Sequence, residues 1–253
     1  MFQHSRLDEI HAYTAMRLGC LPSDLQQART VIVPAKEAFD DNLLVTTARK
    51  NPNIICLTQM PDCSVVRHHP QATDAVAAVL DSIDQSQSLK PSELLQHETV
   101  EAYDSSEPYF YLDVVNFQLL HDSHVVPLSK DTPDHRALVA AFHEHIDEKI
   151  RWFVEIDHPV VYGYQLDTQL VGISSHFLFD HDHFKMAAGG ALVRPDYRKR
   201  NIGKAVVSAA CQWAIDRDYI VEWSSWDKNR ASIALAKSLG FQQFSTDYEF
   251  IVS

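Results

Sequence analysis

Glycine is scarce in this chain of 253 residues, and only Gly19 of the seven glycines precedes residue 160. Cysteine is also rare: Cys20, Cys56, Cys63 and Cys211 form no CxxC pair and no regular spacing. This pattern excludes a disulfide framework and favours reduced, mostly buried thiols. The uneven distribution of glycine separates an N-terminal part of the chain from a C-terminal part.

No hydrophobic run approaches the length of a membrane span, and the first residues, MFQHSRLDEIHAY, contain no apolar leader segment. We therefore expect a soluble, cytoplasmic protein without a membrane partner. The chain also lacks the HExxH and GxSxG patterns of zinc peptidases and serine hydrolases.

A cluster of His and Asp residues at positions 180–183 needs a separate decision. His181 and His183 stand one residue apart, and no third, remote ligand accompanies them. That spacing is poor for a metal ion, so we predict a polar hairpin turn and no metal.

The formal net charge is −12, which excludes a general nucleic-acid binder, while a hydrophobic fraction of 45% supplies a proper core. Against this acidic average, five basic residues lie close together: Arg194, Arg198, Lys199, Arg200 and Lys204. A local basic cluster of this kind favours a small polyanionic ligand. The acidic remainder could favour a cationic substrate, or it could serve solubility alone.

The cluster lies inside residues 186–203, MAAGGALVRPDYRKRNIG. The apolar start predicts a buried strand, Pro195 ends regular pairing, and helical spacing begins at Ile202. A helix N-terminus offers free N–H groups and a positive dipole end, so the order strand, basic turn, helix predicts a phosphate site. Gly203 would let a diphosphate approach the main chain closely. The alternative is a solvated, charged helix start.

RPDYRKRNIGKAVV resembles the acetyl-CoA signature Arg/Gln-x-x-Gly-x-Gly/Ala of the GNAT N-acetyltransferase superfamily, matched by Arg198, Asn201 and Gly203. Asn201 replaces the first glycine and tolerates an unusual turn better than most residues. Downstream, the segment 226–241, WDKNRASIALAKSLGF, resembles the family's next helix with its Asn and terminal Gly-Phe. Two motifs in the right order form a specific resemblance, and it covers residues 123–253.

The resemblance implies an α/β (α+β) chain with the GNAT acyl-CoA N-acyltransferase fold. Such a fold has a mixed, mostly antiparallel sheet with flanking helices, here preceded by a smaller α/β domain. We place the domains at residues 1–122 and 123–253. The N-terminal domain would cover the acceptor site or mediate formation of a homodimer.

The resemblance also implies a set of residues that bind acetyl-CoA as co-substrate. Backbone amides of the basic turn would hold the diphosphate, the strand end would pair with the pantetheine arm, and a main-chain N–H there would polarise the thioester carbonyl. The helix that follows would contact the arm. These residues are Ala191, Leu192, Val193, Arg198, Lys199, Arg200, Asn201, Ile202, Gly203, Lys204, Asn229 and Ser232. Alternatively, Asn229 is simply the N-cap of its helix.

The catalytic groups are harder to predict. Many family members have a Tyr as general acid where this chain has Ala236, so Ser232, Tyr248 or a water would replace it, or the thiolate would leave unprotonated. Glu222 in YIVEWSSW is the first candidate for the general base and His176 the second. The alternative for Glu222 is an outward-facing residue of an alternating strand. Gly189 and Gly190 predict a bulge or the close approach of a ligand.

The sequence also predicts the boundaries of two helices and one strand in the N-terminal part. A short helix is expected over residues 24–29 with Ser23 as its N-cap, a second helix over 92–98, and an aromatic strand over 109–117. The expected function is transfer of an acetyl group to a primary amine of a small molecule or peptide, by direct attack in a ternary complex. The alternatives are a non-catalytic acyl-CoA sensor and a structural protein on the same frame.

Overall fold

The computed structural model describes residues 2–35 and 50–253. Its contacts divide the chain into two compact units, which do not follow the chain order. The first unit comprises residues 1–109, 224–230 and 243–253, and the second comprises 110–223 and 231–242. The domain division expected at residue 122 remains a prediction.

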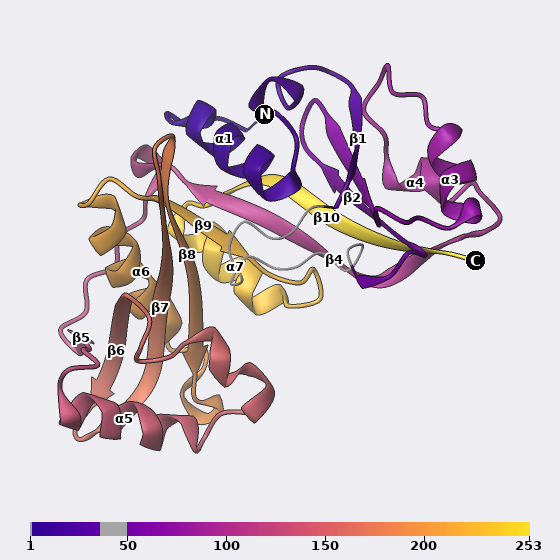
Figure 1. The fold of residues 1–253 in the computed structure, drawn as a ribbon. Helices are drawn as coiled ribbons and strands as arrows, with labels where there is room; N and C mark the ends of the chain where they lie inside the picture. The colour runs from indigo at the N-terminus through magenta and orange to yellow at the C-terminus, as the bar shows by residue number, and fades with distance from the viewer. Residues whose placement is uncertain (1, 36–49) are drawn as a thin grey trace. The chain divides into compact units, whose positions relative to one another are not determined.

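The first unit combines a sheet with short helices (Figure 1). Its elements are α1 (Leu7–Leu18), η1 (Pro22–Asp24), β1 (Thr30–Pro34), β2 (Ile54–Gln59), β3 (Ser64–His68), α3 (Asp74–Asp81), α4 (Pro91–Leu94), β4 (Val100–Leu112) and β10 (Gln242–Val252). The strand order is β1-β3-β2-β10-β4. β1 and β3 are parallel, whereas β2 is antiparallel to both β3 and β10.

A buried ion network stabilises this unit between its strands. The Asp247 carboxylate on β10 lies 3.2 Å from the Arg67 guanidinium on β3 and 3.3 Å from that of Arg17 on α1. Thr58 donates its hydroxyl to the same carboxylate at 2.6 Å. Only 4% of the Arg67 side chain is exposed, so Asp247 supplies the counter-charge that makes its burial tolerable.

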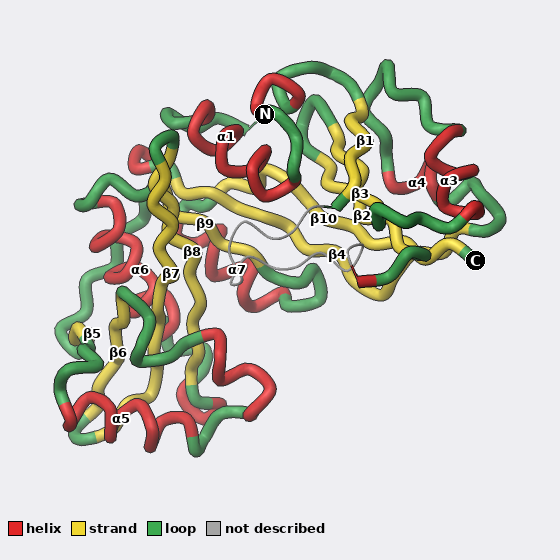
Figure 2. Tube along the Cα trace, in the orientation of Figure 1, coloured by secondary structure: helices red, strands yellow, loops and turns green. Residues whose placement is uncertain are grey.

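The second unit is built on the strand order β4-β9-β8-β7-β6-β5, drawn in yellow in Figure 2. Its elements, besides the end of β4, are η2 (Val114–Asn116), β5 (Val125–Pro127), α5 (Pro133–His143), η3 (Glu148–Phe153), β6 (Val160–Leu166), β7 (Gln169–His181), β8 (Phe184–Val193), η4 (Pro195–Tyr197), α6 (Ile202–Ile215), β9 (Ile220–Ser224) and α7 (Arg230–Leu239). β5 to β8 are antiparallel neighbours, and β8 is parallel to β9.

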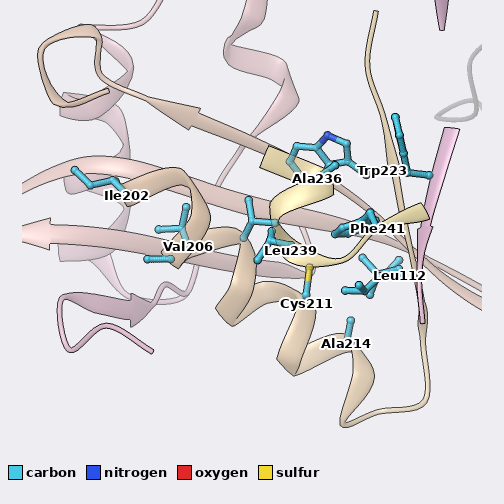
Figure 3. Close-up of a cluster of buried hydrophobic side chains, with 14 of the residues drawn as sticks. Leu112, Ile202, Val206, Cys211, Ala214, Trp223, Ala236, Leu239 and Phe241 are labelled. Atoms are coloured by element: carbon cyan, nitrogen blue, oxygen red, sulfur yellow. The ribbon is translucent and has the colours of Figure 1, made fainter. Parts of the chain in front are cut away.

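Each face of this sheet is covered by a different set of helices. One face packs against α6 and α7, and Figure 3 shows Ile202, Val206 and Cys211 of α6 meeting Leu239 of α7 and Phe241 in one apolar cluster. On the opposite face, α5 packs against the sheet in a second apolar cluster. Burial at this helix contact raises the pKa of the Cys211 thiol, as expected for a structural cysteine.

The expected fold class is confirmed: the sheet is mixed and mostly antiparallel, with flanking helices. Most of the expected strands and helices are present, including the hairpin turn between His181 and Phe184. Among the helices that the structure describes, none is long and apolar enough to cross a membrane.

Three expected elements are wrong in detail. The helix expected over residues 92–98 is shorter and begins one residue earlier, as α4 at Pro91–Leu94. The helix expected at 24–29 is replaced by the 3₁₀ turn η1, because Pro22 starts that turn one residue before the expected cap. The aromatic strand runs from Val100 to Leu112 instead of 109–117. It ends because the Asp113 side chain accepts a hydrogen bond from the Val115 N–H and so stabilises the turn η2.

Candidate active site

The first main-chain donors of α6 have no acceptor within the helix. Asn201 precedes the helix with φ 61° and ψ 6°, a left-handed conformation, and its side chain makes no capping hydrogen bond. The first helical bond runs from the Ala205 N–H to the Asn201 carbonyl at 3.0 Å. The N–H groups of Ile202, Gly203 and Lys204 therefore have no intrahelical acceptor. Such a helix start is suited to an anion.

The left-handed turn explains how the chain builds this start without the first glycine of the signature. Lys199 and Asn201 both have φ of 61°, and Asn is among the residues that accept this region at low cost. Because Asn201 sits in this region, its side chain does not reach the N–H groups that an ordinary Asn cap would satisfy. These donors stay available to a ligand.

The basic residues of the turn divide into two groups. Arg198 donates from Nε to the Val193 carbonyl at 3.2 Å, and Arg200 donates from Nη2 to the Asp196 carbonyl at 3.2 Å, so both brace the turn. Within the described part of the chain, no hydrogen bond or ion pair holds the ammonium groups of Lys199 and Lys204. These two lysines supply the positive field beside the free amides.

Strands β8 and β9 separate just before this turn. They pair in parallel from Met186 opposite Ile220 to Ala188 opposite Glu222, and within the described residues the ladder goes no further. β8 continues to Val193, paired with β7 on its other edge. The edge of β8 from Gly189 onward can therefore bind an extended ligand by main-chain hydrogen bonds. Ala191, Leu192 and Val193, the residues predicted to contact the pantetheine arm, lie on this edge.

The point where the ladder ends, at Ala188 and Glu222, is here called the apex. Successive residues of a strand point to opposite faces. Val221 and Trp223 belong to the α6/α7 cluster, so Glu222 between them points to the α5 face. Its side chain is 5% exposed, and Tyr111 donates its hydroxyl to Glu222 Oε2 at 2.7 Å. The outward-facing alternative for Glu222 is wrong, because β4 covers this position.

The predicted bulge at Gly189 and Gly190 is absent, since β7 and β8 pair regularly across both residues. The missing side chains instead make room for protein neighbours. A Cβ on Gly189 would lie 2.6 Å from His176 Nε2, and one on Gly190 would lie 2.8 Å from the Phe153 carbonyl oxygen. The close approach is thus made by the chain itself, one neighbour on each face of the sheet.

The α5 face of the apex carries groups that sequence reasoning missed. His158 Nδ1 lies 2.6 Å from the Ser175 hydroxyl, opposite Gly190 on the ladder. Burial lowers the pKa of His158 to about 4, so its imidazole is neutral at physiological pH. Nearby on η3, Trp152 and Phe153 are stacked with ring centroids 3.9 Å apart and are partly exposed. No motif marks these residues, since only the register of β7 and the path of η3 bring them here.

The other predicted catalytic residues belong to other elements than Glu222. His176 is on the α6/α7 face, opposite Glu222. The Ser232 hydroxyl on α7 accepts a hydrogen bond from Trp223 Nε1 at 2.9 Å. Tyr248 belongs to the first unit, where it packs against the cluster around α3, and Asn229 directly precedes α7. The roles of all four in catalysis or cofactor binding stay predictions.

Comparison with known proteins identifies the region that contains the apex and the α6 N-terminus. Residues 121–241 match the family model described as acetyltransferase (GNAT) family. No curated protein matches the sequence. Of solved structures, a GNAT-family acetyltransferase from Colwellia psychrerythraea is 17% identical with a TM-score of 0.49, over 70% of each chain. A GCN5-related N-acetyltransferase-like protein from Streptococcus suis 89/1591 is 13% identical with a TM-score of 0.45, over 98% of this chain and 100% of the other.

Proposed function

We propose that the chain is an acyltransferase that transfers an acetyl group from acetyl-CoA to a primary amine, because residues 121–241 match the acetyltransferase (GNAT) family model. The observation that carries this proposal is the continuity of three features. Free amides at the start of α6 adjoin the open edge of β8, and that edge leads to the buried carboxylate of Glu222 at the apex.

The cofactor would bind with its diphosphate on the N–H groups of Ile202, Gly203 and Lys204, where the helix dipole and the two lysines favour negative charge. Its pantetheine arm would pair with β8 along Ala191 to Val193. A main-chain N–H of this edge would donate to the thioester carbonyl and stabilise the oxyanion that forms on attack. No metal ion is needed for this chemistry, because the amides supply the stabilising charge.

The amine would approach from the α5 face, since Glu222 points there. The carboxylate would take a proton from the ammonium or attacking amine, and Tyr111 holds Oε2 in place by its 2.7 Å hydrogen bond. On the same face, the main-chain carbonyl of Phe153 lies beside Gly190, and the exposed rings of Trp152 and Phe153 are stacked on each other. Aromatic faces attract cations, so this pair would favour an acceptor that is protonated in solution.

Calorimetric titration with coenzyme A tests the cofactor site first. We expect binding for the wild-type chain and a clear loss when Gly203 is replaced by Pro, because proline removes one donor of the site. Proline is tolerated in the first turn of a helix, so the fold should survive. If the wild-type chain gives no heat with millimolar coenzyme A, the enzymatic proposal is wrong.

Release of free thiol in the presence of polyamines, aminoglycosides and amino acids tests catalysis. Glu222→Gln should lower kcat by about 10²-fold or more while leaving coenzyme A affinity unchanged, since general bases contribute 10²–10⁴-fold. Glu101→Gln, on the exposed part of β4, is the matched control and should keep full activity. Coenzyme A binding without thiol release from any amine would instead favour the sensor alternative.

A further inference from the structure

His176 is a buried polar side chain that the proposed reaction does not yet use. It is 0% exposed, and neither Nδ1 nor Nε2 has a hydrogen-bond partner within the described residues. It stands on β7 opposite Gly189 of β8. The position of a Cβ on Gly189 would be 2.6 Å from His176 Nε2 and 3.5 Å from the Trp223 ring, so the imidazole reaches across β8 toward β9.

An unpartnered N–H in this place is costly. A buried donor without an acceptor destabilises the fold, because nothing in the protein replaces its hydrogen bond to water. Burial also lowers the pKa of His176 to about 4, so the ring is neutral at physiological pH and carries one N–H donor and one acceptor nitrogen. A neutral donor held beside an open strand edge is suited to a ligand that brings an acceptor.

The position of His176 defines which part of the cofactor it would meet. The diphosphate site at the start of α6 follows the Val193 end of β8, and the open edge runs back from there to Gly189. The four steps from Gly189 to Val193 span about 13 Å of strand. A cofactor anchored at the α6 N-terminus and extended along β8 therefore brings its sulfur, at the far end of the arm, to the apex.

We propose that the His176 imidazole donates a hydrogen bond to the coenzyme A sulfur at the apex and stabilises the departing thiolate. This inference rests on the proposed acetyl transfer. It also answers the question raised by Ala236, which is buried in the α6/α7 cluster and carries no acidic group. Ser232 is engaged with Trp223, whereas neither ring nitrogen of His176 has a hydrogen-bond partner among the described residues.

The electron and proton balance of the step is simple. The amine nitrogen forms a bond to the carbonyl carbon, the C–S bond breaks, and the electron pair stays on sulfur. The amine proton goes to the Glu222 carboxylate on the other face. His176 keeps its proton, because a neutral imidazole is too weak an acid to give it up, and the thiolate is protonated by solvent after release.

The test compares coenzyme A with desulfo-coenzyme A, which has hydrogen in place of the thiol, at a pH where the free thiol is ionised. His176→Phe keeps the ring volume and removes the donor. A hydrogen bond to a charged acceptor corresponds to about a ten- to hundredfold change in affinity. We expect His176→Phe to lose that factor for coenzyme A and to bind desulfo-coenzyme A as the wild type does. His176→Gln, whose amide can replace Nε2–H, should recover much of the loss.

Equal changes for both ligands, or no change for either, would overturn the inference, because a packing or water-binding role does not distinguish sulfur from hydrogen. A second measurement needs only the wild-type chain. The ultraviolet absorbance of the thiolate should show the pKa of bound coenzyme A lowered by about one to two units, and an unshifted pKa would also overturn it. If neither ligand binds the wild type, the proposed function itself has failed.

Discussion

The burial of His176 makes a prediction about stability that needs no ligand. Its pKa is about 4 in the folded chain and 6.5 when the group is free in water. The unfolded chain therefore binds a proton between these values that the folded chain does not. The contribution to stability is fully present above pH 6.5, is lost as the pH falls, and changes no further below pH 4.

The size of the effect follows from the two values. Between pH 7 and pH 5 the group should remove about 2 kcal/mol from the free energy of unfolding, and by pH 4 about 3 kcal/mol. The window above pH 5 is the useful one, because most carboxylates remain ionised there. His158 and His11 have lowered pKa values from burial as well, so they add to the loss with the same sign.

Urea unfolding at pH 7 and pH 5 measures this loss, and a difference between variants isolates the residue. His176→Phe cannot be protonated, so its unfolding free energy should fall less than that of the wild type by about 2 kcal/mol over the same range. The control is His183→Asn, at the exposed turn between β7 and β8, which should behave as the wild type does. If His176→Phe and the wild type lose the same amount, the imidazole is not held neutral, and the reasoning fails.

Three further substitutions test the geometry. Gly240→Ala should lower the free energy of unfolding measured with urea by at least about 2 kcal/mol. At φ of +100° the new Cβ would lie 1.9 Å from the Asn116 carbonyl oxygen. An unchanged free energy of unfolding would contradict that contact. Asp247→Ala should lower the free energy of unfolding by about 3–5 kcal/mol, because Arg67 would stay buried without its counter-charge. A loss below about 1 kcal/mol in thermal unfolding would contradict the role of the ion network. Asn201→Gly should change the free energy of unfolding by less than about 0.5 kcal/mol, because Asn already accepts the left-handed turn at low cost, and should keep coenzyme A affinity within about twofold. A large loss of affinity in calorimetry would mean that the Asn201 side chain binds the ligand.

The α6 start is the part of the site that local sequence determined most completely. Pro195 ends the strand, the basic residues follow, and helical spacing begins at Ile202 as observed. The substitution of Asn201 for glycine was also understood from sequence, because the preference of Asn for left-handed backbone is a local property. Turn and helix-terminus chemistry depends on neighbours in the chain, so it can be predicted from a single sequence.

Predictions from neighbouring residues also gave wrong bounds for some helices and strands. The helix expected over residues 24–29 failed because Pro22 and the Asp24 side chain, which accepts from the Leu21 N–H, stabilise a short turn instead. The strand expected over 109–117 ended early at Leu112. In both places a side chain hydrogen-bonds to the backbone and competes with the regular element.

The chemistry of the apex was decided by tertiary structure. An alternating strand tells which residues share a face, but not which face is covered, and so Glu222 could be read as exposed until Tyr111 of β4 was seen to pack over it. Gly189 and Gly190 signalled a close approach, yet only the register of β7 shows that the His176 ring fills one of those spaces. By itself the sequence determined the order of elements and the backbone of the α6 N-terminus that we propose as an anion site, because these depend on neighbouring residues. Which carboxylate and which imidazole meet the open edge of β8 depends on pairing between strands far apart in the chain, and that is a property of the folded sheet alone.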